Sequence, residues 1–347
     1  MDARENYLRA IEFRNPQWIP ITVYILPAAW MKYREDLEKI ILRHPKIFRH
    51  YKKGNKDFDE CPLGYRKGYY RDNWGCLWYN LEEGILGQVV EHPLSDWKFL
   101  DTYKPPDPFK KGDFGEYDWD EIKRTVEEQK KKGLLTSGSG GQLFTRLWYL
   151  RGFENLMMDI ATDDPHLLRL IEMLTDYALK LVNEWLKIGV DIIGFHTDIG
   201  GQNSLMISPT KFRKYIKPMF KKIFMTYRKA GMHVFLSSDG CLLEIIDDLV
   251  ECGVSVHDPQ FRANTLEGIL KAYKAKLCAM VDLDQQEVLP FGTPKEIDKH
   301  VRDVVKKLNS SRGGLMIYTE IQQTYPLRNI EAIFEALEKY CLPNKNI

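Results

Sequence analysis

From Gly133 onward the chain alternates short apolar runs with amphipathic stretches long enough to form helices, and this alternation limits its fold more than any other feature. A parallel strand can follow another only after a crossover of a dozen or more residues, usually a helix, so repeated strand-then-helix units predict a parallel sheet. The predicted strands lie at residues 134–137, 190–196, 233–237, 254–257, 276–281 and 314–318. The predicted helices lie at residues 165–188, 209–230, 241–252, 265–275, 294–308 and 327–340.

The amino-terminal part adds a further unit and then an unusual segment. A helix over 4–12, a buried strand within 18–25 and a helix over 30–42 are expected from the apolar spacing. Residues 46–130 are instead rich in Tyr, Trp, Gly, Pro and charge, and their alternating aromatics predict a β-hairpin insertion followed by a polar helix over 119–132. The first strand and one strand of the insertion bring the expected total to eight.

Eight such units in 347 residues predict an α/β fold of the (β/α)8 TIM-barrel type, a single domain over 1–347 with an N-terminal helix and a lid-like insertion at 46–130. The alternative is a doubly wound sheet, which commonly carries a GxGxxG fingerprint. The glycine cluster at 137–141 has Leu143 where the third glycine of that fingerprint belongs, so we assign these glycines to a loop.

Charge and composition narrow the class of protein. Fifty Lys and Arg against 49 Asp and Glu, with no large basic cluster, argue against a nucleic-acid surface. No apolar run approaches the ~20 residues of a membrane span, and the charged start at 1–6 does not resemble a secretory signal. Six scattered cysteines without metal-binding spacing fit free thiols in a reducing compartment. We therefore expect a cytoplasmic protein.

The active site of a (β/α)8 barrel forms where the carboxyl ends of its strands meet. Five predicted strand ends are rich in carboxylates, amides and one histidine, and the residues that we select from them are His196, Asp198, Gln202, Ser237, Asp239, Gln260, Asp282, Gln285 and Glu320. A ring of acids with a histidine suits a divalent metal or paired acid and base catalysis. The alternative for any single Asp or Ser is that it only caps the helix that follows.

We assign catalytic roles to Asp239, Asp198 and, in the insertion, Asp72. The residues that we expect to bind substrate are His196, Gln202, Ser237, Gln260, Asp282, Gln285, Trp74 and Arg151. In the insertion, Trp74 and Asp72 point to the same side of a strand because side chains alternate. Core packing of the tryptophan and a lid over a planar ligand both remain open.

The strand-end motifs, together with others along the chain, resemble the uroporphyrinogen decarboxylase-like superfamily, a barrel family that includes cobalamin-linked methyltransferases. The segments that carry the resemblance are 6–10 with 16–20, 72–75, 150–155, 208–218, 238–240, 258–260 and 291–294. The resemblance implies a TIM barrel and an enzyme of the decarboxylase or methyltransferase type.

Two departures bear on function. The decarboxylase carries Arg-x-x-x-Arg just after its first strand to hold the substrate carboxylates, whereas residues 24–30 here contain no arginine. The zinc methyltransferases use His-x-Cys after one strand and a later Cys, but this chain has Ser237-Ser238-Asp239 at the first place and Glu320 near the second. A metal would therefore need oxygen donors and a histidine, and we predict His196, Asp239 and Glu320.

Three functions follow as hypotheses. The first is a methyltransferase that moves a methyl group from a small O- or N-methylated compound to a corrinoid protein docked on the barrel, with Asp239 and Glu320 polarising the leaving group. The second is a decarboxylase or lyase for a tetrapyrrole or other acidic small molecule, with Asp72 or Asp198 stabilising a cationic intermediate and Arg151 binding substrate. The third is a catalytically lapsed ligand-binding barrel. A homodimer is left open.

Overall fold

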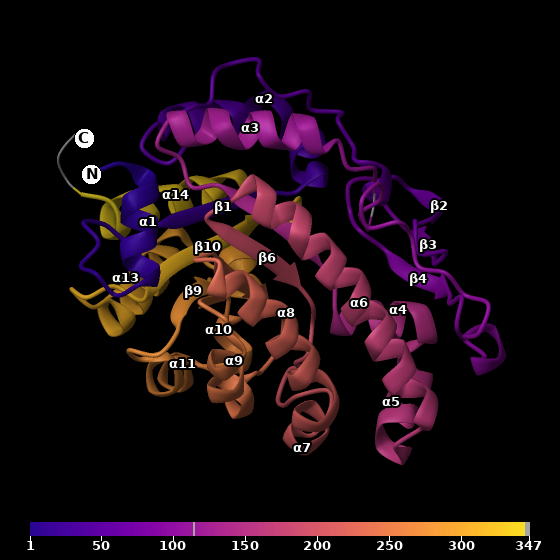
Figure 1. Cartoon of the computed structure of the whole chain (residues 1–347). Helices are drawn as coiled ribbons and strands as arrows, with labels where there is room; N and C mark the ends of the chain where they lie inside the picture. The colour runs from indigo at the N-terminus through magenta and orange to yellow at the C-terminus, as the bar shows by residue number, and fades with distance from the viewer. Residues whose placement is uncertain (114, 344–347) are drawn as a thin grey trace.

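The computed structural model describes residues 1–113 and 115–343, and its main sheet consists of seven parallel strands. These are β1 (Ile21–Ile25), β5 (Ser137–Gly141), β6 (Ile192–His196), β7 (His233–Ser237), β8 (Val256–His257), β9 (Cys278–Asp282) and β10 (Leu315–Ile321). Their order is β1-β10-β9-β8-β7-β6-β5. The sheet curls into a partial barrel with helices outside it, as Figure 1 shows, so the α/β barrel-type fold is confirmed.

Helices connect the strands as the alternation predicted. After β1 comes α2 (Pro27–Arg43), and the later helices are α6 (Pro165–Ile188), α7 (Pro209–Lys211), α8 (Lys217–Lys229), α9 (Ile246–Cys252), α10 (Phe261–Asn264), α11 (Leu266–Tyr273), α12 (Val288–Phe291), α13 (Pro294–Leu308) and α14 (Leu327–Cys341). A π-helical turn (Phe212–Ile216) joins α7 to α8, and a 3-10 turn η4 (Leu243–Ile245) precedes α9. Pro218 has no N–H to donate, and the π turn just before it accommodates the break.

The prediction of an eighth barrel strand from the insertion is wrong. The insertion strands β2 (Gly68–Arg71), β3 (Leu77–Asn80) and β4 (Gln88–Glu91) form a separate antiparallel sheet in the order β2-β3-β4. Side chains of β2 and β3 alternate between more and less exposed positions, which suits a sheet with one solvated face. A parallel barrel strand is buried on both faces instead. In the described residues, no strand pairing joins β1 to β5.

The N-terminal helix α1 (Ala3–Ile11) packs across the amino ends of the barrel strands. The Tyr7 hydroxyl donates to the backbone oxygen of Ile21 in β1 at 3.0 Å. Further along the sheet, the Arg4 guanidinium binds the Asp191 carboxylate just before β6 at 2.6 Å. The predicted N-terminal helix is thus confirmed, and it covers the end of the barrel opposite the carboxyl ends of the strands.

Strand β5 corrects a second prediction, because the glycine cluster is the strand and the apolar run at 134–137 largely precedes it. A Cβ on Gly138 would lie 2.6 Å from the Trp185 ring of α6, and one on Gly140 would lie 2.3 Å from Phe195 of β6. Large aromatic side chains therefore pack directly on the backbone here. A strand under such close contact needs glycine, and this hid it from hydrophobic patterning.

The insertion packs on the barrel through α4 (Phe144–Arg151) and α6. It also contains the 3-10 turns Leu63–Tyr65 and Trp97–Phe99 and ends in α3 (Trp119–Lys131), while α5 (Phe153–Thr162) follows α4. Figure 1 places β2–β4 at the right of the view, beyond α6 and α4. The fully buried Arg146 of α4 binds Asp72 at 2.7 Å and Asp113 at 2.9 Å, so one cation holds two points of the insertion.

Within the described residues, no helix has both the length and the apolar composition that a membrane crossing requires.

Candidate active site

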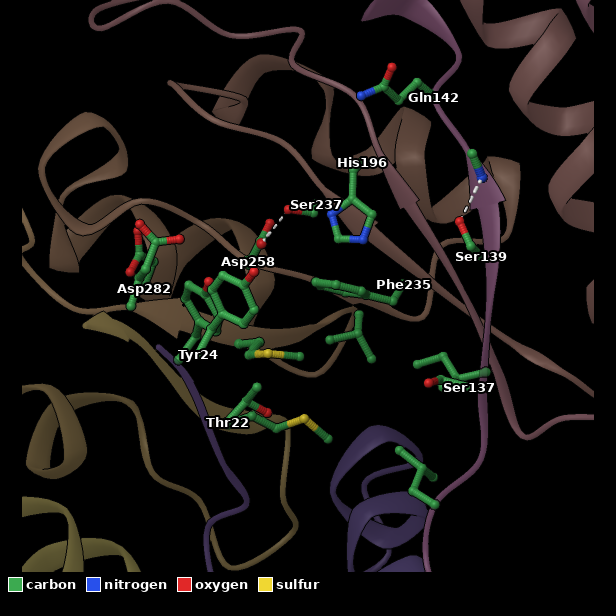
Figure 2. Close-up of a pocket in the computed structure, with 18 of the residues that line it drawn as sticks. Thr22, Tyr24, Ser137, Ser139, Gln142, His196, Phe235, Ser237, Asp258 and Asp282 are labelled. Carbon is green, nitrogen blue, oxygen red and sulfur yellow. Dashed lines mark hydrogen bonds between the residues drawn. The ribbon is translucent and has the colours of Figure 1, made fainter. Parts of the chain in front are cut away.

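A cavity of about 1510 Å³ runs along the barrel axis to the carboxyl ends of the strands. Because side chains of a strand alternate between its two faces, every second residue points into it. The deeper layer is apolar: Ile192, Phe235, Val256, Met280 and Met316. The layer above is polar: Thr22, His196, Ser237, Asp258, Asp282 and Tyr318. Figure 2 shows part of both layers around the opening.

The insertion supplies one wall of the cavity. Tyr65, Leu86, Asp113, Glu116 and Tyr117 all line it. Residues 46–130 thus contribute to the cavity, and a lid-like role for this segment stays a prediction. Helix α1 closes the opposite end with Tyr7 and Ile11.

Acidic groups dominate the charge of the cavity. Six carboxylates line it, namely Asp113, Glu116, Asp239, Asp258, Asp282 and Glu320. Among the described lining residues there is one histidine and no lysine or arginine. Asp113 is neutralised from behind by Arg146, but the other five have no ion-pair partner within the described part of the chain. The cavity therefore favours cations and disfavours anions.

Asp258, at the end of β8, is held by the loop that follows β7. The Ser237 hydroxyl donates to one carboxylate oxygen at 2.7 Å, and the Ser238 N–H donates to the other at 3.1 Å. Burial raises the pKa of Asp258 to about 8, and repulsion from Asp239 adds to this shift. The two hydrogen bonds act in the opposite direction because they stabilise the ionised carboxylate. Asp258 is therefore mainly protonated at neutral pH and can donate a proton or a hydrogen bond.

Asp239 lies close to two other acids. Its carboxylate accepts from the Gln260 side-chain amide at 2.7 Å, and its N–H donates to Asp198 at 3.0 Å. Burial first, and then repulsion from Asp198 and Glu320, raises the pKa of Asp239 to about 6. An acid with this pKa can exchange a proton near neutral pH.

Asp282 is the most buried of these acids, with 5% of its surface exposed. One of its oxygens accepts from the Gln285 amide at 2.8 Å, whereas the other has no hydrogen-bond partner within the described residues. Burial, together with repulsion from Asp258, Asp239 and Glu320, raises the pKa of Asp282 well above its usual value. Burial also raises the pKa of Glu320, although the Gln322 amide donates to it at 3.0 Å.

His196 ends β6 and faces the cavity (Figure 2). Enclosure by the protein lowers its pKa, although Asp198 and Asp113 act in the opposite direction. The imidazole is therefore mainly neutral at pH 7 and can accept a proton or a hydrogen bond.

The structure brings most of the predicted strand-end residues to one place. Those that line the cavity are His196, Ser237, Asp239, Asp282, Gln285 and Glu320. Asp198 and Gln260 lie behind Asp239 and orient it through the two hydrogen bonds above. Gln202 accepts from Gln286, a lining residue, at 3.5 Å. Their catalytic and binding roles remain predictions.

Three further predicted residues also lie outside the lining, namely Asp72, Trp74 and Arg151, and the catalytic role of Asp72 and the substrate-binding roles of Trp74 and Arg151 stay predictions. Asp72 is buried and accepts from Arg146, from the Trp78 ring N–H and from the backbone N–H groups of Trp74 and Cys76. The Trp74 ring packs on Tyr177 with centroids 4.5 Å apart and donates to Asp113. These two residues build the insertion.

Arg151 is the third. Its guanidinium binds Asp159 at 2.7 Å and the backbone oxygen of Leu94 at 3.1 Å. Its guanidinium therefore joins α5 to the segment after β4 rather than facing the cavity.

Sequence reasoning did not select Asp258 or the tyrosines of the wall, Tyr24, Tyr65 and Tyr318. All four line the cavity. Asp258 directly follows an apolar run, as the chosen residues do, so the same rule could have found it. Tyr318 lies two residues before Glu320 on the same strand, so the alternation of side chains that places Glu320 in the cavity also places Tyr318 there. Nothing in the sequence marks Tyr65 as a neighbour of the barrel.

The predicted metal ligands share the cavity without forming a coordination site. Among residues 1–113 and 115–343, no group of three or more His, Cys, Asp or Glu side chains is arranged to hold a metal ion. His196, Asp239 and Glu320 would need to move together to do so, so the metal remains a prediction.

The chain resembles known proteins in both sequence and fold. The model of the uroporphyrinogen decarboxylase (URO-D) family matches residues 77–340. The chain belongs to the URO-D family. Curated URO-D relatives include the uroporphyrinogen decarboxylases of two Thermus thermophilus strains, each 24% identical over 178 residues, or 49% of this chain and 48% of the relative. The match thus spans about half the length of these relatives.

A solved structure resembles the whole chain. A methyltransferase from Methanosarcina mazei matches with a TM-score of 0.68 and 15% identity, covering 98% of this chain and 99% of that one. This likeness shows that the complete URO-D-type fold, insertion included, has a counterpart among known structures.

Proposed function

We propose that this URO-D protein is a methyltransferase that moves a methyl group from a small O- or N-methylated compound to the cobalt of a separate corrinoid protein. The observation that carries the proposal is the charge of the cavity, where five carboxylates lack a cationic partner and no described lysine or arginine is present. A tetrapyrrole with many carboxylates would find no lysine or arginine among the described lining residues to pair with, which is costly in a desolvated site. The missing arginines at 24–30 point the same way.

The fold is compatible with this choice. A methyltransferase is among the solved structures that share the fold over nearly the whole chain. The wide cavity at the carboxyl ends leaves room for a small donor beneath a docked partner.

Chemically, cobalt(I) of the partner attacks the methyl carbon, and the bond from that carbon to oxygen or nitrogen breaks with its electron pair going to the heteroatom. An alkoxide or amide leaving group then needs a proton. Asp239, with its pKa near 6, is positioned by Gln260 and Asp198 to supply it. A bound divalent metal at His196, Asp239 and Glu320 would stabilise the same leaving group as a Lewis acid.

The test is to mix the protein with a cobalt(I) corrinoid protein, without oxygen, and with a panel of O- and N-methylated compounds. We expect the absorbance of methyl-cobalt and one equivalent of demethylated product for at least one donor. No methyl-cobalt with any donor, together with formation of coproporphyrinogen from uroporphyrinogen, would establish the decarboxylase instead. Tight ligand binding without either reaction would establish a binding protein.

A further inference from the structure

We infer that the ligand of this cavity is a small N-methylated ammonium cation, bound with its charged nitrogen beside Asp258 and Asp282. The inference deepens the proposed function, since its catalytic part rests on methyl transfer. Its binding part stands on the cavity alone.

The first observation is an unmet demand for positive charge deep in the cavity. Asp282 is 5% exposed, lines the cavity and leaves one oxygen without a donor in the described residues. Buried acceptors are nearly always paired, and a buried carboxylate costs most when it lacks a cation. Asp258 lies beside it, also facing the cavity. A ligand cation would supply the counter-charge that the described chain lacks and would displace the protons that otherwise neutralise these acids.

The second observation is the aromatic wall around these acids. Tyr24, Tyr65 and Tyr318 line the cavity, and Figure 2 shows Tyr24 on the same side of it as Asp258 and Asp282. Tyr318 is paired in register with Asp282, so it lies on the neighbouring strand at the same level. Aromatic faces attract ammonium groups that cannot donate a hydrogen bond, because the ring quadrupole is negative over its face.

The third observation is the apolar layer directly beneath the acids. Phe235, Val256, Met280 and Met316 form it. Methyl groups on nitrogen are apolar but carry part of the positive charge, so a methylated ammonium group fits between this layer and the carboxylates. A hydrated metal ion or a primary amine would gain nothing from the apolar side.

The reaction is balanced for such a donor. When cobalt(I) attacks a methyl group of a quaternary ammonium ion, the C–N bond breaks and its electron pair stays on nitrogen. The product amine leaves without formal charge and needs no proton. The cavity acids then act by binding the donor and need not activate its leaving group.

The experiment is calorimetric titration with choline and with 3,3-dimethylbutan-1-ol, which has the same shape without the charge; tetramethylammonium and N-methylpyridinium complete the panel. We expect at least one cation to bind, and choline to bind at least about tenfold more tightly than its neutral analogue, since a desolvated charge partner is worth that much or more. Asp282→Asn should remove most of this preference. Asp247→Asn, on the exposed side of α9 and paired with Lys276, should leave it unchanged.

Binding should also depend on pH. A cation favours the ionised carboxylates, so its affinity should rise from pH 6 to pH 8.5 with release of protons, whereas that of the neutral analogue should not. The titratable groups that interact with Asp258, Asp282 or both are Asp239, Asp284, Glu320, Tyr273, Tyr318 and Tyr325. Asp258→Asn provides a second variant should Asp282→Asn fold poorly, as judged by circular dichroism.

The outcomes separate this inference from the proposed function. Equal affinity for choline and its neutral analogue, or no binding of any cation at millimolar concentration, would overturn the inference. Methyl transfer from neutral methyl ethers without preference for cations would overturn it while supporting the methyltransferase. Selective cation binding that yields no methyl-cobalt would support the ligand class and reject methyl transfer.

Discussion

Replacing Asp258 by asparagine should make the protein more stable at neutral pH, and the gain should grow with pH. The carboxylate of Asp258 accepts from Ser237 and from the Ser238 N–H. An asparagine can accept from Ser238 with its oxygen and donate to the Ser237 hydroxyl with its nitrogen. Both hydrogen bonds survive, so the substitution removes only the ionisation of a buried acid.

The size of the effect follows from the pKa of this group. Its usual value of 3.8 applies to the unfolded chain, and burial raises the pKa in the folded protein to about 8. Between these values the folded state holds a proton that the unfolded state has lost, so stability falls as pH rises. Without screening, the loss is about 2 kcal/mol at pH 5 and about 5 kcal/mol at pH 8, at ~1.36 kcal/mol for each pKa unit. Water in the cavity screens part of this, which leaves a change of roughly 2 kcal/mol between the two pH values.

The measurement is urea unfolding of wild type and Asp258→Asn at pH 5, 6, 7 and 8, followed by tryptophan fluorescence and circular dichroism. We expect the difference in unfolding free energy to widen steadily with pH, because all other titrating groups are common to both proteins. Asp303→Asn, at an exposed ion pair with Lys299, is the control and should show no such widening. A difference that stays constant from pH 5 to pH 8 would refute the reasoning, since Asp258 would then titrate alike in both states.

Three further predictions concern the stability of the insertion, the proton donor Asp239 and the predicted metal site. Arg146→Met should lower the unfolding free energy by about 3–5 kcal/mol, because it leaves Asp72 and Asp113 without their shared cation, whereas Arg71→Met at an exposed pair should cost little; thermal unfolding compares the two. If the donor is an ether, the rate of methyl transfer should change with pH near 6 in wild type, and Asp239→Asn should abolish this change. If the pH–rate profile of the variant still shows the change, another group protonates the leaving oxygen. Mass-spectrometric metal analysis of wild type and Asp239→Ala should show a stoichiometric metal only in wild type if the predicted ligands hold one; retention in the variant would exclude Asp239 as a ligand.

Much of the cavity could be predicted from the sequence because strand ends of a parallel sheet share one edge. The run at 233–237 matches β7 at both ends, and its next residues include Asp239. The prediction failed where contacts between distant residues, and not the local hydrophobic pattern, determine which residues form a strand. Strand β5 is built from glycines because Trp185 and Phe195 press on its backbone, and no local rule reads that from the chain.

The insertion shows a different limit. Asp72 and Trp74 lie in the turn between β2 (Gly68–Arg71) and β3 (Leu77–Asn80), so the alternation of a strand, from which we placed them on one side, does not apply to them. The deciding residue is Arg146, whose pairing with Asp72 spans 74 positions along the chain. A buried cation on a helix gives no sign in the sequence of which distant acid it will bind.

The missing eighth strand also explains why the cavity is so deep. In a complete barrel, layers of side chains from eight strands fill the interior. Here only seven strands contribute side chains, α1 covers the far end of the cavity with Tyr7 and Ile11, and Gly194 leaves an inward position of β6 without a side chain. The space so gained lies directly under the carboxylates. The barrel can therefore enclose the apolar part of a ligand beneath its charged part, whereas a filled barrel would restrict binding to the surface of its mouth.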